Sequence, residues 1–262
     1  MGDRSSYPAG TFCWVDLATS DALAATAFYT QLFGWTSEVT TTSGAPYTTF
    51  SKNGRRVCAL YPMDAEMRGR GTPPFWQSYV LVDSVDAATA QARSLGAGVF
   101  LEPCDVMDAG RMAVIQDPTA AVFSLWEPGS HHGAQLVNEP GSLCWNELQT
   151  HDPERAGAFY EQLFGWTVEA VAAEREPPYF NFHHQGRLAG GLLPLRPDVA
   201  ILPNWAVYFA VADCDAAADA IRRLGGTLVL EPQQVDELGS FAVAQDPEGA
   251  LFAVIRLANP DD

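Results

Sequence analysis

The stretch AFYTQLFGW at residues 27–35 returns almost unchanged as AFYEQLFGW at residues 158–166, and this repeat decides the fold. Eight of the nine residues are identical, and the two copies are offset by 131 residues in a chain of 262. In the first copy Phe28 and Leu32 recur at helical spacing, and Gly34 follows as a residue that commonly ends helices. The stretch therefore predicts the last turns of a helix that packs on a sheet, once in each half of the chain.

The duplication extends well beyond this stretch and covers nearly the whole chain. Trp14 corresponds to Trp145 at the same offset, whereas Asp117 corresponds to Asp246 at an offset of 129. The second half therefore has a loop that is two residues shorter between these two positions. The sequence EPGSHHGAQLVNEPGS, rich in Gly, Pro and Ser, joins the halves and is typical of a linker. The predicted organisation is a first domain over 9–128, a linker over 129–140 and a second domain over 141–258.

Each half divides again into two similar units. In the first unit a short strand leads to Asp21, a typical helix cap, and the helix that follows ends at Gly34. Strand-like runs come next, with Asn53-Gly54 as a hairpin signal. The pattern βαβββ occurs four times in the chain, and one such unit is too small to cover its own sheet. We therefore predict an α+β fold of four βαβββ units, which form two tandem domains with curved, mainly antiparallel sheets around ligand-sized cavities.

The composition limits the partners and the compartment. Fifteen Lys and Arg against 32 Asp and Glu give a net charge of −17, which repels phosphate backbones and anionic lipid headgroups. Because of this charge we expect no nucleic-acid partner and no membrane partner. A membrane span is not expected either, because no apolar run reaches the roughly 20 residues that it needs. The N-terminal segment lacks the apolar core of a secretion signal, so we expect a cytoplasmic protein. An odd number of cysteines without CxxC spacing favours free thiols over disulfides: Cys13, Cys58, Cys104, Cys144 and Cys214.

Together the repeated segments resemble the vicinal oxygen chelate superfamily, which includes glyoxalase I, bleomycin-resistance proteins, extradiol dioxygenases and fosfomycin-resistance enzymes. The segments that carry the resemblance are HDPERAGAFYEQLFGW and its first copy, VDSVDAATAQARSLGAGV with VADCDAAADAIRRLGGTL, and QDPTAAVFSLWEP with QDPEGALFAVI. Their order and spacing cover nearly the whole chain twice. The tandem form with CW in its opening strands is similar to actinobacterial glyoxalase-like proteins that are often labelled hydroxylases.

The resemblance implies a divalent metal on the concave sheet face, which binds two oxygens of a substrate and stabilises an enolate or oxyanion. The implied ligands are His, Glu or Gln on the first and last strands of the units. At the matching positions the chain has Trp14 and Trp145, Gln77 and Ala206, and Ser124 and Ala253, with Cys58 as a further thiol. Trp and Ala cannot bind such a cation, and a lone Gln or Ser cannot hold one. We therefore predict that both halves lack the usual metal site and use no cofactor.

Alternation along the first strand places an aromatic ring and a carboxylate on the same face in each half. We expect Phe12, Trp14 and Asp16 to face the first cavity, and Trp145 and Glu147 to face the second. One interpretation is a stacking platform beside a catalytic acid or base. The other is a structural carboxylate, either at the rim in water or paired with one of three arginines: Arg55, Arg111 or Arg187.

The same register predicts further ligand-binding residues on the two walls. These are Gln77, Tyr79, Ser124 and Trp126 in the first half, with Tyr208 and His183 in the second. We expect aromatic residues of the hairpin strands to close the pockets: Tyr47, Phe50, Tyr179 and Phe182. Small residues such as Gly191 and Ala206 favour a roomier second pocket. We interpret His131 and His132 as solvent-exposed linker residues.

Three functions remain open at this point. The first is a metal-independent glyoxalase-like protein that binds a small, partly aromatic organic ligand, for sequestration, resistance or a non-metal lyase or isomerase step. The second is a divalent-metal-dependent lyase or dioxygenase with an atypical site, for example from His183, Glu147 and Asp16. The third is a non-catalytic interaction protein with vestigial pockets. The sequence does not decide whether the chain is an enzyme, and we expect a monomer or homodimer.

Overall fold

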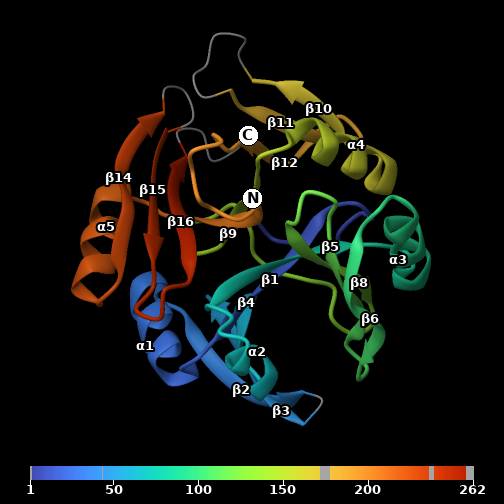
Figure 1. Ribbon diagram of the computed structural model, residues 1–262. Coiled ribbons are helices and arrows are strands. Elements are labelled where there is room, and N and C mark those ends of the chain that lie inside the picture. The colour runs from blue at the N-terminus through green and yellow to red at the C-terminus, as the bar shows by residue number, and fades with distance from the viewer. Residues whose placement is uncertain (1, 43, 172–177, 236–238, 258–262) are drawn as a thin grey trace.

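A computed structural model describes residues 2–42, 44–171, 178–235 and 239–257 and contains two eight-stranded sheets, one in each half (Figure 1). The first sheet has the order β2-β3-β4-β1-β5-β8-β7-β6. Its strands are β1 (Phe12–Thr19), β2 (Thr36–Thr42), β3 (Ala45–Lys52), β4 (Arg55–Pro62), β5 (Phe75–Leu81), β6 (Gly98–Val106), β7 (Gly110–Gln116) and β8 (Val122–Pro128). Its helices are α1 (Ala22–Phe33), α2 (Ala65–Gly69) and α3 (Val85–Ser94).

The second sheet repeats this arrangement with the order β10-β11-β12-β9-β13-β16-β15-β14. Its strands are β9 (Leu143–Thr150), β10 (Thr167–Ala170), β11 (Phe180–His184), β12 (Arg187–Pro194), β13 (Asn204–Ala210), β14 (Thr227–Val235), β15 (Gly239–Gln245) and β16 (Leu251–Leu257). The helices are α4 (Pro153–Phe164) and α5 (Cys214–Arg223). The predicted α+β fold of four βαβββ units, two in each tandem half, is confirmed.

Two central antiparallel strands join the units within each sheet. In the first sheet β1 pairs antiparallel with β5, while β1–β4 and β5–β8 are the parallel pairs. The second sheet has the same pattern around β9 and β13. Alternate residues at the middle of the central strands therefore project onto one concave face of each sheet, where the candidate site residues lie.

The predicted helix signals act as expected at both copies of the repeated stretch. The Asp21 side chain accepts hydrogen bonds from the backbone N–H groups of Leu23 and Ala24 in the first turn of α1, and the Asp152 side chain accepts one from the backbone N–H of Arg155 in α4. The helices end at Gly34 and Gly165, whose φ angles of 66° and 71° lie in the left-handed region that glycine adopts without strain.

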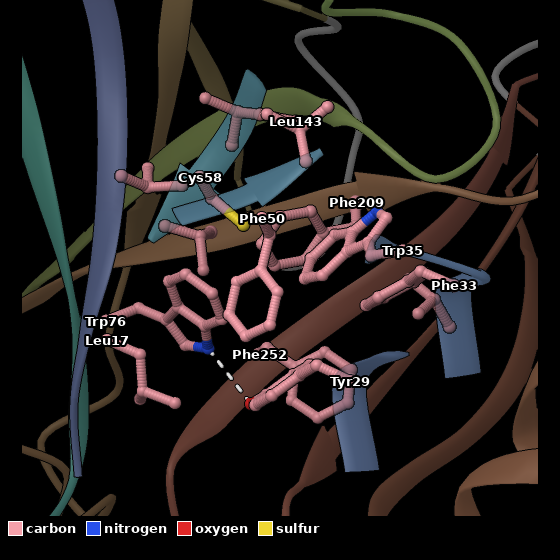
Figure 2. Close-up of a cluster of buried hydrophobic side chains, with 14 of the residues drawn as sticks. Leu17, Tyr29, Phe33, Trp35, Phe50, Cys58, Trp76, Leu143, Phe209 and Phe252 are labelled. Carbon is pink, nitrogen blue, oxygen red and sulfur yellow. Dashed lines mark hydrogen bonds between the residues drawn. The ribbon is translucent and has the colours of Figure 1, made fainter. Parts of the chain in front are cut away.

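The helices of the repeated stretch, α1 and α4, pack against elements of both halves. One core joins α1, β1, β3 and β4 to β13, α5 and β16, and the other joins α3 and β8 to α4 and β11. Figure 1 shows α1 beside the strands of the fourth unit and α3 near α4. Figure 2 shows the first core, where Tyr29, Phe33 and Trp35 of the repeated stretch meet Phe209 and Phe252 of the second half.

Three sequence predictions about side-chain direction are wrong. Phe50 and Phe182 are fully buried in the two helix-side cores, so neither closes a pocket. Phe12 packs against Trp166 and Trp205 of the second half instead of the concave face. The reason is a register shift in the β1–β5 pairing between Phe12 and Trp14, since one extra residue reverses the alternation on that side.

Two other expectations concern the membrane and the thiols. In the described ranges no helix combines the length and the apolar character needed to cross a bilayer. All five cysteines are free, and Cys13, Cys58 and Cys214 are buried. Burial raises the pKa of each of these three thiols, so they are unreactive side chains of the interior.

Candidate functional site on the concave sheet faces

The first concave face holds a chain of hydrogen-bonded side chains that ends on a carboxylate. Trp14 Nε1 donates to Tyr47 Oη at 3.0 Å, and Tyr47 Oη donates to Asp16 Oδ2 at 3.1 Å. Tyr79 Oη donates to the same Asp16 oxygen at 3.0 Å from the neighbouring strand β5. Two tyrosine hydroxyls therefore hold one carboxylate oxygen in a fixed position beside an indole ring.

The Asp16 carboxyl is buried and only partly satisfied. It is 3% exposed, and its Oδ1 atom has no hydrogen-bond partner among the described residues. Burial raises the pKa of Asp16 to about 7, and the hydrogen bonds from Tyr79 and Tyr47 oppose this shift only in part. A carboxyl group with such a pKa can exchange a proton near neutral pH, as acid–base groups of enzymes do.

The other predicted residues of the first wall lie on the adjacent strands. Gln77 is paired with Asp16 across β1 and β5, and its Nε2 donates to Ser124 Oγ at 3.1 Å. The ring of Trp126 is 6.3 Å from that of Tyr79 between centroids, in an edge-to-face arrangement. The structure thus brings together the residues that strand alternation predicts for this wall, and their role in ligand binding stays a prediction.

The second concave face repeats the arrangement with Glu147 in place of Asp16. Trp145 Nε1 donates to Tyr179 Oη at 3.0 Å, and Tyr208 Oη donates to Glu147 Oε1 at 3.0 Å. Gln149 Nε2 donates to the same oxygen at 3.0 Å. Burial, and secondarily the negative charge of Glu147, raise the pKa of Tyr208 well above its ordinary value. Tyr208 therefore keeps its proton and remains a hydrogen-bond donor.

Gly191 makes room for the aromatic pair of the second wall. It is paired with Glu147 across β12 and β9. A Cβ atom at this position would lie 2.0 Å from Tyr179 Oη and 2.8 Å from Trp145 Nε1. Only glycine allows Tyr179 to lie over this strand and accept the indole hydrogen bond.

Two of the three candidate arginine partners, Arg55 and Arg111, pair with carboxylates elsewhere. Asp16 and Glu147 accept hydrogen bonds from tyrosines, as described above. Arg111 instead forms ion pairs with Asp86 and Asp105, and Arg55 pairs with Asp3. The interpretation of a carboxylate neutralised by Arg55 or Arg111 is therefore wrong.

Tyr47 and Tyr179 have a larger role than sequence reasoning gave them. We expected them only to close the pockets, whereas each links the tryptophan of the first strand into the carboxylate wall. A signal for this role exists in the sequence, because PYTTF at 46–50 and PYFNF at 178–182 occupy equivalent places in the two halves.

Within the two histidine pairs, His131 contradicts its prediction and His132 agrees with it. His131 is half-buried against the first wall, with its ring 4.5 Å from that of Trp14 between centroids, so its interpretation as a solvent-exposed residue is wrong, whereas His132 is exposed. His183 Nε2 lies 3.5 Å from Glu169 Oε2 of the edge strand β10. The register places Asn181, not His183, level with Glu147, so His183 lies towards the rim of the second wall.

Family models match the two halves separately. The model described as "Glyoxalase/Bleomycin resistance protein/Dioxygenase superfamily" matches residues 11–125, and the one described as "Glyoxalase-like domain" matches residues 145–255. A protein of Mycobacterium bovis named "Putative glyoxylase CFP32" is 41% identical over 261 residues, which cover 98% of this chain and 99% of that protein. The chain belongs to the glyoxalase superfamily. The resemblance drawn from the repeated segments is thereby confirmed.

Other relatives of this glyoxalase-superfamily chain carry different names. "Anthracycline biosynthesis protein DauV" of Streptomyces sp. strain C5 is 35% identical over 263 residues, 96% of this chain and 94% of that protein. Among solved structures, the Mn(II)-bound glyoxalase from Novosphingobium aromaticivorans has a TM-score of 0.64 at 16% identity, covering 100% of this chain and 86% of its own. Homoprotocatechuate 2,3-dioxygenase from Brevibacterium fuscum has a TM-score of 0.66 at 15% identity, covering 96% and 82%. Such low identities show a shared fold.

The metal ion that the superfamily implies does not fit the side chains of either wall. Next to Asp16 the neighbouring strands carry Ala59 and Gln77, and the Gln77 amide is already bonded to Ser124. The corresponding positions of the second wall are Gly191, Ala206 and Ala253, which offer no side-chain donor atom. Across the described ranges, no three or more His, Cys, Asp or Glu side chains are grouped so that they could hold a metal ion. We assign no chemical step to a metal ion on these walls.

Proposed function

We propose that this glyoxalase-superfamily chain binds a small, partly aromatic organic molecule on the concave wall of its second half, without a metal ion. The observation that carries the proposal is the pair formed by Glu147 and Tyr208, 3.0 Å apart, beside the half-buried ring of Trp145. An indole face provides a stacking surface, and a carboxylate next to a hydroxyl fixes the orientation of a polar ring substituent.

The shape of the second wall supports a planar ligand. Ala206 and Ala253, level with Glu147 and Tyr208 on the neighbouring strands, carry only a methyl group beside this pair. Relatives at 35% identity are named for anthracycline biosynthesis, and an anthracycline contains a fused, partly aromatic ring system with hydroxyl and carbonyl groups. A ligand of this chemical class presents a flat ring to the indole and phenolic oxygens to Glu147.

The same geometry supports proton transfer to and from the bound molecule. A carboxylate that accepts one hydrogen bond from Tyr208 and one from Gln149 is held in place, so it meets the acidic hydrogen of a ligand in a fixed direction. Tyr208 stays protonated and can donate to a carbonyl oxygen on which negative charge develops. These groups are sufficient for a lyase or isomerase step that needs no oxidant.

Binding can be tested with 1,8-dihydroxyanthraquinone as the probe, by isothermal titration on protein dialysed against a chelator. We expect binding that is unchanged when Mn²⁺ is added, and a loss of roughly tenfold or more in Glu147→Gln, because a charged acceptor is replaced by a neutral one. The matched control is Glu161→Gln on the exposed face of α4, which should bind as the unaltered protein does. Binding that requires Mn²⁺ supports a metal enzyme, and no binding of planar ligands supports an interaction protein; either result overturns the proposal.

A further inference from the structure

The linker between the halves lies on the concave wall of the first half. Ala134 N donates to Cys13 O at 2.8 Å, and Gln135 N donates to Arg56 O at 2.7 Å. Tyr7 Oη donates to Ala134 O at 2.7 Å, so the N-terminal segment covers the linker from the other side. Ala134 and Val137 belong to the same buried cluster as the concave-face residues of this wall: Trp14, Ala59, Tyr79, Leu81 and Trp126.

The imidazole of His131 lies between the two tryptophans of this wall. Its ring is edge-to-face with Trp14 at 4.5 Å and with Trp126 at 5.7 Å between centroids. Trp126 Nε1 also donates to the His131 carbonyl oxygen at 2.9 Å, which ties the backbone to the same place. Burial lowers the pKa of His131 to about 4, so a neutral planar ring contacts the aromatic wall at neutral pH.

The close approach of the linker is built into its sequence at Gly133. This residue has φ of +110°, a conformation open to glycine. A Cβ atom there would lie 2.5 Å from Cys13 O and 2.9 Å from a ring carbon of Tyr7. The segment therefore fits between the first strand and the N-terminal segment only with glycine at this position.

The second wall differs from the first where the His131 ring lies. Trp14 is 3% exposed, whereas its counterpart Trp145 is only half-buried. Trp126 pairs with Leu81 in the first sheet, and at the equivalent place in the second sheet Ile255 pairs with Ala210. The second wall therefore has an isoleucine where the first wall has its second indole ring. The two walls share the carboxylate and tyrosines but differ in what contacts the tryptophan.

We infer that residues 131–137 are a built-in occupant of the first concave wall, with His131 as its ring, and that the chain offers one ligand site, on the second wall. The second part of this inference rests on the proposed function, whereas the occupation of the first wall can be tested without any ligand. The wall of the first half then serves the fold by anchoring the linker, and the second half serves binding.

Acrylamide quenching of tryptophan fluorescence tests the occupant directly. Trp145→Phe removes the half-buried indole, so the remaining tryptophans of this variant are all buried. Adding His131→Ala should raise the quenching constant about twofold, because Trp14 and Trp126 gain contact with solvent.

His132→Ala in the same background is the matched control, since His132 is exposed, and it should leave the quenching constant unchanged. Gly133→Ala, which displaces the linker by a different route, should act as His131→Ala does. Equal quenching in the His131→Ala and His132→Ala variants overturns the inference.

Native mass spectrometry with 1,8-dihydroxyanthraquinone tests the number of sites. We expect one bound probe in the unaltered protein, none in Trp145→Leu, and one still bound in Trp14→Leu. Two bound probes, or loss of the single probe in Trp14→Leu but not in Trp145→Leu, overturns the division between the halves while planar-ligand binding itself stands. If no probe binds to any variant, the proposed function fails, and the quenching result alone decides whether the linker fills the first wall.

Discussion

Tyr29 Oη of the first half lies 3.0 Å from Asp246 Oδ2 of the second half. The reciprocal pair, Tyr160 and Asp117, is 2.8 Å apart, and both tyrosines come from the repeated stretch while both aspartates precede proline in a turn. All four residues are buried. Each repeated helix is thus tied by a hydrogen bond to the half that did not supply it, so the two domains form a single interlocked structure.

This relationship predicts the effect of removing one hydroxyl. Tyr29→Phe leaves Asp246 Oδ2 and the Trp76 Nε1–H without their shared partner inside the core. We expect a loss of about 1–3 kcal/mol in the free energy of unfolding, the usual cost of unsatisfied buried polar groups. Unfolding in urea, followed by circular dichroism, should remain a single transition because the two larger cores each contain residues of both halves.

The control for this change is Tyr61→Phe, whose hydroxyl makes no hydrogen bond to a described residue. It should alter the free energy of unfolding by no more than about 0.5 kcal/mol. Two separate transitions in Tyr29→Phe, with the first half unfolding alone, would show that the halves are independent domains.

The buried Asp16 carboxyl predicts a pH dependence of stability. Because its pKa in the folded state is raised to about 7, the folded state holds a proton that the unfolded state releases near its ordinary value of 3.8. The contribution of Asp16 to stability is therefore present at low pH and is lost as the pH rises through 7. Asp16→Asn retains an acceptor for Tyr47 and Tyr79 but cannot ionise, so the variant should gain up to about 4 kcal/mol relative to the unaltered protein between pH 4 and pH 8.

Urea unfolding at these two pH values measures this difference, with the exposed Asp83→Asn as the control. A constant difference between Asp16→Asn and the unaltered protein at both pH values would mean that Asp16 is ionised in the folded state throughout.

The fold could be predicted from the sequence because the same local signals occur in both halves of the chain. The helix caps Asp21 and Asp152 and the stops Gly34 and Gly165 are local signals, and each depends only on backbone geometry near the residue itself. Period-two alternation then placed Asp16 and its neighbours on the concave face. These predictions needed no knowledge of what lies across the molecule.

The predictions that were wrong depended on contacts with other parts of the molecule. Phe12 was misplaced because a bulge in the pairing of β1 with β5 breaks the alternation, and the strand's own residues do not reveal a bulge. His131 was misplaced because a linker rich in glycine and proline reads as solvent-exposed, although here it fills a concave face. The hydroxyl of Tyr47 reaches Asp16 from a strand 31 residues away, so only the folded sheet shows that Tyr47 holds this carboxylate.

Gly191 offers a test of the second wall that spares the carboxylate. In Gly191→Ala the added methyl group would occupy the place of the Tyr179 hydroxyl, so Tyr179 must move and the Trp145 indole loses its partner. We expect binding of 1,8-dihydroxyanthraquinone to weaken by roughly tenfold, the equivalent of about 1.4 kcal/mol. Leu188→Ala on the same strand, where the side chain is 54% exposed, is the control and should bind normally. Unchanged affinity in Gly191→Ala would separate Tyr179 and Trp145 from the binding surface.

The neutral imidazole of His131 predicts sensitivity to acid. Burial, with a smaller effect from the charge of Arg56, lowers its pKa to about 4 in the folded state, whereas the unfolded chain binds the proton near 6.5. The unfolded state therefore holds more protons between these values, and stability falls as the pH decreases from 6.5 to 4. Since one pKa unit corresponds to about 1.4 kcal/mol, His131 alone lowers the free energy of unfolding by up to about 3 kcal/mol across this range.

His131→Phe keeps a planar ring against Trp14 and Trp126 but cannot be protonated, so it should lose less stability than the unaltered protein between pH 6.5 and pH 4. The Asp16 contribution is the same in both proteins and cancels in the comparison, and His132→Phe should follow the unaltered protein. An identical acid response in His131→Phe and the unaltered protein would mean that His131 stays accessible to protons and does not fill the wall.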